Sequence, residues 1–274
     1  MRWDALSQAE RNAAYNNALA VLDSPQLKQL RETASAAYRD AHPAGLDLAY
    51  GTDPRQKWDL FPSDRSGAPC LVFIHGGYWQ MNSRELFASI AVGMAAHGWS
   101  VALPGYRLAP QAPLGDIVHD IRSALDWLAT EGVAWGIGGP VVLAGWSAGA
   151  HLAAMTLDHP MVGAGLGISG IYDLERVSET YVNDKLRLSG DDVVRLSPMR
   201  LSVTPKRFDI AFGTAELPAL VEESRNFRAY RADAGAPGEL LPILGADHFT
   251  ILDALSSPSG ALVERILGLA REIA

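Results

Sequence analysis

The chain has 274 residues, 48% of them hydrophobic, with a formal net charge of -8 at pH 7 and a pI near 5.3. That acidity argues against nucleic acid and anionic membranes as partners, and the single cysteine, Cys70, excludes an internal disulfide framework. The chain opens without a signal-like pattern, and it has no apolar run of the roughly 20 residues that span a membrane. We therefore expect a cytoplasmic protein without a membrane partner, and the oligomeric state stays open, with a homodimer as one option.

The pattern of elements indicates a single α/β domain over residues 1–274, which opens with a helical segment over residues 1–42. Helix-forming residues extend from 7 to about 41, with a break at Ser24-Pro25. Short strands are expected at 46–50 and 57–61.

Strands and helices alternate after residue 70. The expected strands are 70–74, 100–104, the run that ends at 146, 165–170, 207–214 and 239–244, and the expected helices are 83–97, 114–130 and 217–232. Continuous apolar runs are typical of strands that are buried on both faces. The alternation therefore predicts a mostly parallel central sheet with helices on both faces.

The first strand of this series ends in His75-Gly76-Gly77-Tyr78-Trp79. A His-Gly-Gly loop after a strand is typical of esterase-like hydrolases, where its backbone N–H groups supply half of an oxyanion hole. Glycine is required there because the backbone itself must approach the substrate oxygen. The candidate donors are the N–H groups of Gly77, Tyr78 and Ala148, with Gly76 as the alternative in register.

The sequence Gly145-Trp146-Ser147-Ala148-Gly149 follows an apolar strand and precedes a helix of small residues. This pattern predicts a nucleophile elbow, in which the serine lies at the tip of a sharp turn. Larger side chains at the two glycine positions would collide with the neighbouring backbone. The helix that follows points its N-terminus, with free N–H groups, at the serine.

Residues from 171 to about 205 interrupt the alternation between the sixth and seventh core strands. The segment is polar and irregular, and we expect it to form a small cap over the site. It carries Tyr172 and Tyr181, which are placed to reach the site.

A histidine base and a carboxylate should complete a triad with Ser147, in the chain order serine, acid, histidine. His248 follows the last expected strand and is the candidate base, whereas His75 and His151 suit supporting positions. Glu216 follows the penultimate strand and is the candidate acid. Asp173 is the alternative acid.

Aromatic residues flank these motifs. Tyr78, Trp79, Trp146 and Tyr172 are candidates for the wall of a compact acyl pocket that could stack an aryl leaving group. For Trp79 and Trp146, packing in the core beneath the loop is an equally good interpretation.

On these motifs the chain resembles the α/β-hydrolase superfamily over nearly its whole length, and within it the kynurenine formamidase (arylformamidase) and esterase branch. The segments that carry the resemblance are 15–17, 75–79, 145–152, 169–174, 196–198 and 246–249. Two positions depart from the pattern: Ala150 stands where a second glycine is common, and Glu216 stands where the eukaryotic enzymes use aspartate.

The resemblance implies a hydrolase that cleaves an N-formyl aryl amine, such as N-formylkynurenine, or small carboxylic esters. We interpret the chain as a serine hydrolase that uses no cofactor and no metal and acts on a small molecule through an acyl-enzyme. The alternative function is a carboxylesterase for short-chain or aryl esters. A more distant alternative is a ligand receptor on an inactive scaffold, which loss of the serine or the histidine would indicate, and neither is lost.

Overall fold

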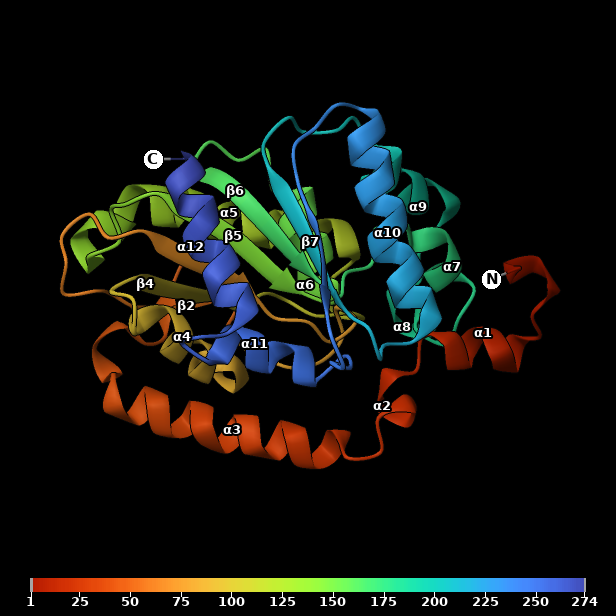
Figure 1. The fold of residues 1–274 in the computed structure, drawn as a ribbon, viewed down its shortest axis with the longest axis horizontal. Coiled ribbons are helices and arrows are strands. Elements are labelled where there is room, and N and C mark those ends of the chain that lie inside the picture. The colour runs from red at the N-terminus through yellow and green to blue at the C-terminus, as the bar shows by residue number, and fades with distance from the viewer. Residues whose placement is uncertain (1, 274) are drawn as a thin grey trace.

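The computed structural model describes residues 2–273 and contains one eight-stranded sheet between layers of helices (Figure 1). The strands are β1 (Leu48–Ala49), β2 (Lys57–Phe61), β3 (Cys70–Ile74), β4 (Ser100–Pro104), β5 (Val141–Trp146), β6 (Val162–Ile168), β7 (Phe208–Gly213) and β8 (Leu240–Ile243). Their order in the sheet is β1-β2-β4-β3-β5-β6-β7-β8. The pairs β1–β2 and β2–β4 are antiparallel and the remaining pairs are parallel, so the sheet is mostly parallel, as the alternation predicts.

Alternate residues of the central strands face two separate cores. In β3, Cys70, Val72 and Ile74 belong to one buried cluster, and Leu71 and Phe73 belong to the other. Both faces of the strand are therefore covered, which explains why it is a continuous apolar run rather than an alternating one.

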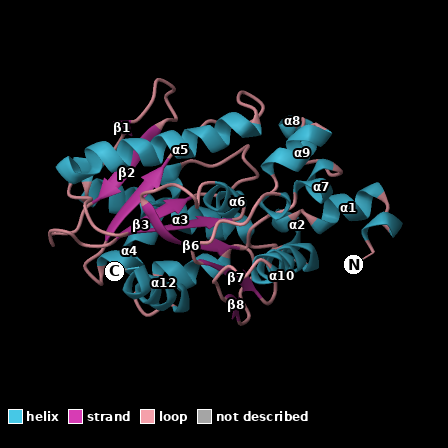
Figure 2. Cartoon of the chain, turned by 90° about the horizontal axis from the view of Figure 1, so that it is seen from above, coloured by secondary structure: helices cyan, strands magenta, loops and turns pink. Residues whose placement is uncertain are grey.

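Helices cover both faces of the sheet. The longer ones are α3 (Ser24–Ala41), α5 (Leu114–Glu131), α6 (Ala148–Met155), α10 (Pro218–Asp233) and α12 (Ala261–Ile273). The shorter ones are α1 (Gln8–Ala14), α2 (Asn17–Ala20), α4 (Ala91–Ala95) and α11 (Asp253–Ser256), with 3-10 turns at Trp3–Ala5, Pro43–Gly45, Arg84–Ile90, Gly132–Trp135 and Thr250–Leu252. Seen from above, α5 lies on one side of the sheet and α4 and α12 lie on the other (Figure 2).

The N-terminal region is helical, but the expected break is in the wrong place. Residues 21–23 separate α2 from α3, and Pro25 lies in the first turn of α3. Proline is well suited to that turn because its missing N–H has no intrahelical acceptor there. A second break, at Tyr15 and Asn16, separates α1 from α2. The expected helix 83–97 begins as the 3-10 turn Arg84–Ile90 and becomes α-helical only at Ala91.

The segment between β6 and β7 is not irregular, which corrects the expectation from its polar composition. It forms α7 (Leu174–Ser178), α8 (Asn183–Leu186), α9 (Gly190–Leu196) and a 3-10 turn at Pro198–Arg200. It packs beside the N-terminal helices (Figure 1): Trp3 Nε1 donates to the Glu179 carboxylate at 2.6 Å, and Gln8 Nε2 donates to the Glu179 carbonyl at 2.8 Å. Composition misled here because short polar helices gain their stability from tertiary packing.

Candidate active site

Ser147 lies in the tight turn between β5 and α6, with φ 58° and ψ -121°. A Cβ at Gly145 would lie 2.1 Å from the carbonyl oxygen of Gly149, and a Cβ at Gly149 would lie 2.1 Å from that of Ile74. Both distances are far inside van der Waals contact, so only glycine fits either position. The turn therefore requires both glycines of the Gly-x-Ser-x-Gly motif, as the sequence predicts.

His248 approaches Ser147 from the loop after β8. Its Nε2 lies 3.1 Å from Ser147 Oγ, and both residues are almost fully buried. The indole Nε1 of Trp146 donates to the His248 carbonyl at 2.9 Å, which holds the backbone of the histidine loop against the end of β5.

Glu216 follows β7 and lies on the other side of the imidazole. Its Oε2 is 3.4 Å from His248 Nδ1, and its side chain is fully buried. Oε1 accepts hydrogen bonds from the Gly213 N–H at 2.8 Å and from the Ser169 hydroxyl. The separation from His248 exceeds the roughly 3 Å of a well-formed hydrogen bond, and catalytic hydrogen bonds commonly tighten when substrate binds.

Ser169 is a supporting residue that sequence reasoning did not identify. It follows β6 with a left-handed φ of 52°, and its hydroxyl donates to Glu216. A left-handed non-glycine residue is uncommon and often marks a functional turn. Its signals in the sequence are its place at the end of a buried strand and its position at the start of segment 169–174, which is one of those that carry the resemblance.

The alternative acid, Asp173, is engaged elsewhere. Its side chain caps α7 through the Glu175 N–H at 3.0 Å and pairs with Arg200, with Arg200 Nε 3.0 Å from Oδ1. Its backbone N–H also donates to the buried carboxylate of Glu223. These contacts direct Asp173 away from His248, so the structure brings Glu216, and not Asp173, to the imidazole.

The loop after β3 has the strained backbone expected of an oxyanion-hole loop. Gly77 has φ 125° and Tyr78 has φ 52°. Among the described residues, no hydrogen bond from the N–H of Gly77, Tyr78 or Ala148 is present in the loops, turns or caps. Gly76, the alternative donor, packs against the elbow, since a Cβ there would lie 2.6 Å from the Trp146 carbonyl oxygen.

His75 fastens this loop rather than acting as a base. Its ring stacks between Tyr106 and Phe87, with ring centres 4.3 Å and 5.7 Å away, and its Nδ1 lies 2.8 Å from the Gly76 carbonyl. Complete burial lowers the pKa of His75 to about 4, and burial does the same for His151 under α9. Both imidazoles are therefore neutral near pH 7, as supporting residues should be.

A cavity of about 90 Å³ opens over Ser147 and His248. Its wall includes Asn16, Asn17, Ala18, Lys28, Gly77, Tyr78, Met81, Asn82, Trp146, Tyr181 and Phe249. The N-terminal segment, residues 1–42, supplies four of these residues, none of which sequence reasoning placed at the site. The reason is tertiary: the Tyr78 hydroxyl donates to the Tyr15 carbonyl and accepts from Asn17 Nδ2 at 3.1 Å, which ties the loop after β3 to the start of the chain.

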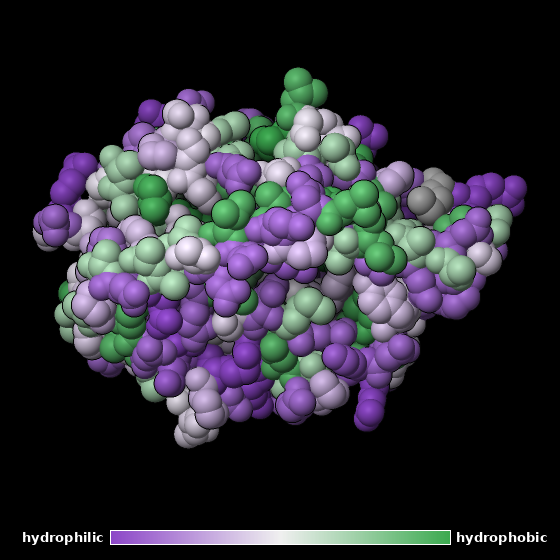
Figure 3. All heavy atoms as spheres, turned by 90° about the horizontal axis from the view of Figure 1, so that it is seen from below, coloured by the Kyte–Doolittle hydropathy of each residue, from purple (hydrophilic) through white to green (hydrophobic). Residues whose placement is uncertain are grey.

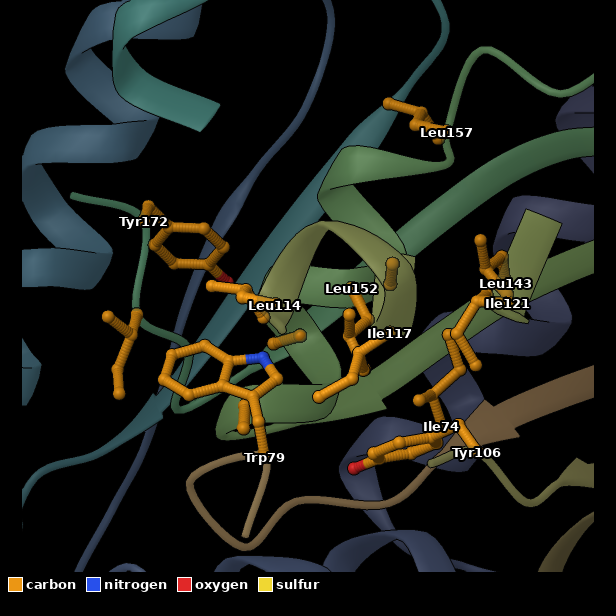
Figure 4. Packing of buried hydrophobic residues seen from close by; sticks show 14 of the residues in the cluster. Ile74, Trp79, Tyr106, Leu114, Ile117, Ile121, Leu143, Leu152, Leu157 and Tyr172 are labelled. Carbon is orange, nitrogen blue, oxygen red and sulfur yellow. The ribbon is translucent and has the colours of Figure 1, made fainter. Parts of the chain in front are cut away.

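Of the four aromatic residues expected in the pocket wall, Tyr78 and Trp146 line this cavity. Trp79 is completely buried against His151, and Tyr172 is completely buried and stacked on Phe227 with ring centres 4.1 Å apart (Figure 4). For Tyr172 the expectation was wrong, and for Trp79 the alternative interpretation, packing in the core, is confirmed, because both rings turn beneath their loops into the apolar core. Tyr181, which the sequence places within reach of the site, also lines the cavity.

Glu223 on α10 joins the N-terminal segment to the segment after β6. Its carboxylate accepts from the Tyr15 hydroxyl at 3.1 Å and from the N–H groups of Tyr172 and Asp173 at 2.9 and 3.1 Å. Burial raises the pKa of Glu223 to about 7, against the lowering effect of these three hydrogen bonds.

Residues 2–273 contain no helix that is both long and apolar enough to cross a membrane. Among the same residues, no group of three or more His, Cys, Asp or Glu side chains is arranged to hold a metal ion.

The chain is similar to known hydrolases. The BD-FAE family model matches residues 59–159. Kynurenine formamidase from Danio rerio is 29% identical over 238 residues, covering 81% of this chain and 80% of that protein. Kynurenine formamidase from Drosophila melanogaster is 30% identical over 226 residues, covering 75% of each.

Esterases are also among the relatives. Isoprenylcysteine alpha-carbonyl methylesterase from Arabidopsis thaliana is 30% identical over 241 residues, covering 73% of this chain and 55% of that protein. A crystal structure from Silicibacter sp. TM1040, provisionally assigned as a thioesterase, superimposes with a TM-score of 0.82 at 28% identity, covering 94% of this chain and 99% of that one. The fold is that of the α/β-hydrolases.

The two candidate acids can be separated by mutation. Glu216→Gln keeps the shape of the side chain but removes the charge that would stabilise a protonated His248, so we expect kcat to fall by roughly 10³- to 10⁴-fold. Asp173→Asn is the matched control and should change kcat much less. Steady-state kinetics on an aryl acetate measures both, and a larger loss in the Asp173 variant would assign the acid to the loop after β6.

The stability of the fold should depend on the protonation of Glu223. Because its pKa is raised from 4.5 to about 7, the folded chain binds this proton more tightly than the unfolded chain. The favourable contribution is complete below about pH 4.5 and is lost as the pH rises through about 7, at a cost of up to about 3 kcal/mol. Glu223→Gln should flatten this part of the pH dependence.

Urea unfolding of the wild type and the Gln variant at several pH values across that interval measures the difference. Equal slopes in the two proteins would show that burial of Glu223 does not link folding to protonation.

Proposed function

The chain belongs to the kynurenine formamidase and esterase branch of the α/β-hydrolase superfamily, and from that premise we propose that it cleaves small acyl groups from aryl amides and esters through an acyl-enzyme on Ser147. Its similarity to kynurenine formamidases and to a methylesterase supports a hydrolase with arylformamidase-like or carboxylesterase activity. The observation that carries the proposal is the line of Ser147, His248 and Glu216 beside a small cavity.

The three residues have distinct roles in this mechanism. His248 Nε2 takes the proton from Ser147 Oγ as the oxygen attacks the substrate carbonyl. The imidazolium then gives that proton to the departing amine or alcohol, and water repeats the sequence to release the acid. Glu216 accepts from Nδ1–H, which fixes the tautomer and stabilises the cation.

Backbone N–H groups stabilise the negative oxygen that forms during attack. The donors are Gly77 and Tyr78 on the loop after β3 and Ala148 at the start of α6. His75 and Asn82 hold the loop: His75 Nδ1 lies 2.8 Å from the Gly76 carbonyl, and Asn82 Nδ2 donates to it at 3.0 Å. Catalysis then requires no reorganisation of these donors when charge develops.

The cavity suits a small acyl group. Its volume of about 90 Å³ leaves room for formyl or acetyl beside Ser147, and Trp146 offers a flat wall to an aryl leaving group. An N-formyl aryl amine such as N-formylkynurenine fits this description. The alternative is a carboxylesterase for short-chain or aryl esters, which the esterase relatives favour.

The N-terminal helices and the segment after β6 together act as the cap of a single domain. Asn17 and Tyr181 come from these two segments and line the same cavity. The hydroxyls of Tyr78 and Tyr181 both donate to the Tyr15 carbonyl, which closes the wall.

Ser147 should be the nucleophile. Ser147→Ala should reduce kcat by on the order of 10⁶-fold with the fold intact, because the members of a triad act as a unit. A fluorophosphonate probe should label Ser147 alone, as peptide mass spectrometry would detect. Ser259→Ala, at an exposed position, is the matched control and should label normally. Labelling of the Ser147 variant at another serine would refute the assignment.

The size of the acyl group should determine the rate. We expect kcat/KM to fall steeply from formyl and acetyl to longer chains, because each misplaced methylene in a tight pocket costs about 1–3 kcal/mol, or roughly 10- to 200-fold. A series of p-nitrophenyl esters of rising chain length, measured beside N-formylkynurenine, tests the trend. Faster turnover of octanoyl than of acetyl esters would contradict this trend. If esters are hydrolysed and N-formylkynurenine is not, only the alternative function, a carboxylesterase, is supported.

A further inference from the structure

A second cavity adjoins the one over Ser147. It has a volume of about 160 Å³ and is lined by Lys28, Arg31, Glu32, Asn82, Leu86, Phe87 and Trp146. Lys28, Asn82 and Trp146 line both cavities. The two spaces therefore share a boundary at Trp146, next to the nucleophile, and the mechanism proposed above uses only the first.

Two cationic side chains of α3, those of Lys28 and Arg31, line the second cavity. Lys28 and Arg31 are three residues apart, so they project from the same face of the helix. Within residues 2–273 neither side chain forms an ion pair within 4.0 Å, and Lys28 is exposed to solvent. On the face that α3 covers, hydrophilic and hydrophobic residues are intermixed (Figure 3).

Arg31 is held in place without using its full hydrogen-bonding capacity. Its guanidinium carbon lies 5.6 Å from the Phe87 ring centre and 5.8 Å from that of Trp146. One terminal nitrogen donates to the Phe249 carbonyl at 3.0 Å. The remaining N–H groups have no acceptor among the described residues, and a planar guanidinium can offer such donors to a carboxylate in pairs.

The other walls are flat and apolar. Trp146, Phe87 and Leu86 form them, so an aromatic ring could lie there. One carboxylate, Glu32, also lines the cavity, and Asp253 stabilises the charge of Arg31 from outside it. The whole chain has a net charge of -8, so an anion should bind only where positively charged side chains cluster. Lys28 and Arg31 form such a cluster at this cavity.

We propose that the second cavity is a leaving-group subsite for an aromatic ring that bears a carboxylate, with Lys28 and Arg31 as the residues that recognise the carboxylate. The proposal rests on the function proposed above, since the ring leaves from an acyl group bound at Ser147. It makes the preferred substrates small-acyl esters and amides of anionic aryl compounds. Lys28 and Arg31 are specificity-determining residues and take no part in proton transfer.

The test compares two substrates of nearly equal shape, 3-acetoxybenzoate and its neutral isostere 3-acetoxybenzamide. The quantity measured is the ratio of their kcat/KM values in each protein, because the intrinsic reactivity of the two esters cancels when ratios are compared between variants. Lys28→Gln should lower this ratio by about 5-fold and Arg31→Gln by about 10-fold, with both effects shrinking as salt is added.

Three variants serve as controls. Lys28→Arg retains the charge and should retain most of the ratio. Glu32→Gln removes the competing carboxylate and should raise the ratio by about 2-fold. Lys185→Gln changes an exposed lysine of α8 that lines neither cavity, and it should leave the ratio as in the wild type. Because Lys28 is exposed, the Lys28 variants should fold. They therefore test the proposal even if Arg31→Gln disturbs the packing of the Phe87 and Trp146 rings.

A binding measurement separates this proposal from the proposed function. Calorimetric titration of the Ser147→Ala protein with 3-hydroxybenzoate and 3-hydroxybenzamide should show tighter binding of the carboxylate, lost in a Ser147→Ala, Lys28→Gln protein. If the carboxylate binds in this way but no acyl ester is cleaved, the subsite stands and the proposed function fails. If esters are cleaved and the ratio is the same in the wild type and in Lys28→Gln, the subsite is overturned and the proposed function stands.

Discussion

The site depends on the close approach of the turn between β5 and α6 to the end of β3. Gly145 and Gly149 allow this approach, because any side chain there would overlap backbone atoms of Gly149 or Ile74. The approach keeps Ser147 in a strained conformation with φ 58° and directs its hydroxyl out of the sheet. Strain of this kind persists only where surrounding contacts fix it, and the hydrogen bond from the Ser147 N–H to the Ile168 carbonyl, at 2.7 Å, is one such contact.

The parallel register of the strands then brings the other components to the same edge. Ile74 pairs with Gly145, Gly145 pairs with Gly167, and Gly213 pairs with Ile243, so the loops after these strands emerge together. This is where open α/β sheets bind ligands. This arrangement places Glu216 beside the imidazole. Its side chain is one methylene longer than that of aspartate, and one carboxylate oxygen reaches His248 while Ser169 and Gly213 donate hydrogen bonds to the other.

The start of the chain is part of the site rather than an appendage. The Tyr15 carbonyl accepts from two tyrosine hydroxyls at the cavity, and the Tyr15 side chain donates to Glu223. One residue thus links the loop after β3, the segment after β6 and α10. The same region places Lys28 and Arg31 at the cavities, so α3 contributes to the surroundings of a leaving group together with Trp146 at the end of β5.

The sequence by itself determined most of the sheet and the line of Ser147, His248 and Glu216. Strands such as 70–74 and 100–104 were predicted to the residue, because a strand buried on both faces must be a continuous apolar run with polar or glycine-rich ends. The elbow, Glu216 and His248 followed from motifs whose spacing is imposed by local backbone geometry and chain order. Only the tertiary structure decided which aromatic residues face the cavity, turning Trp79 and Tyr172 into the core and bringing Asn17 and Lys28 to the wall. Those outcomes depend on contacts between segments far apart in the chain, and neither periodicity nor a local motif encodes which side of a loop a ring will occupy.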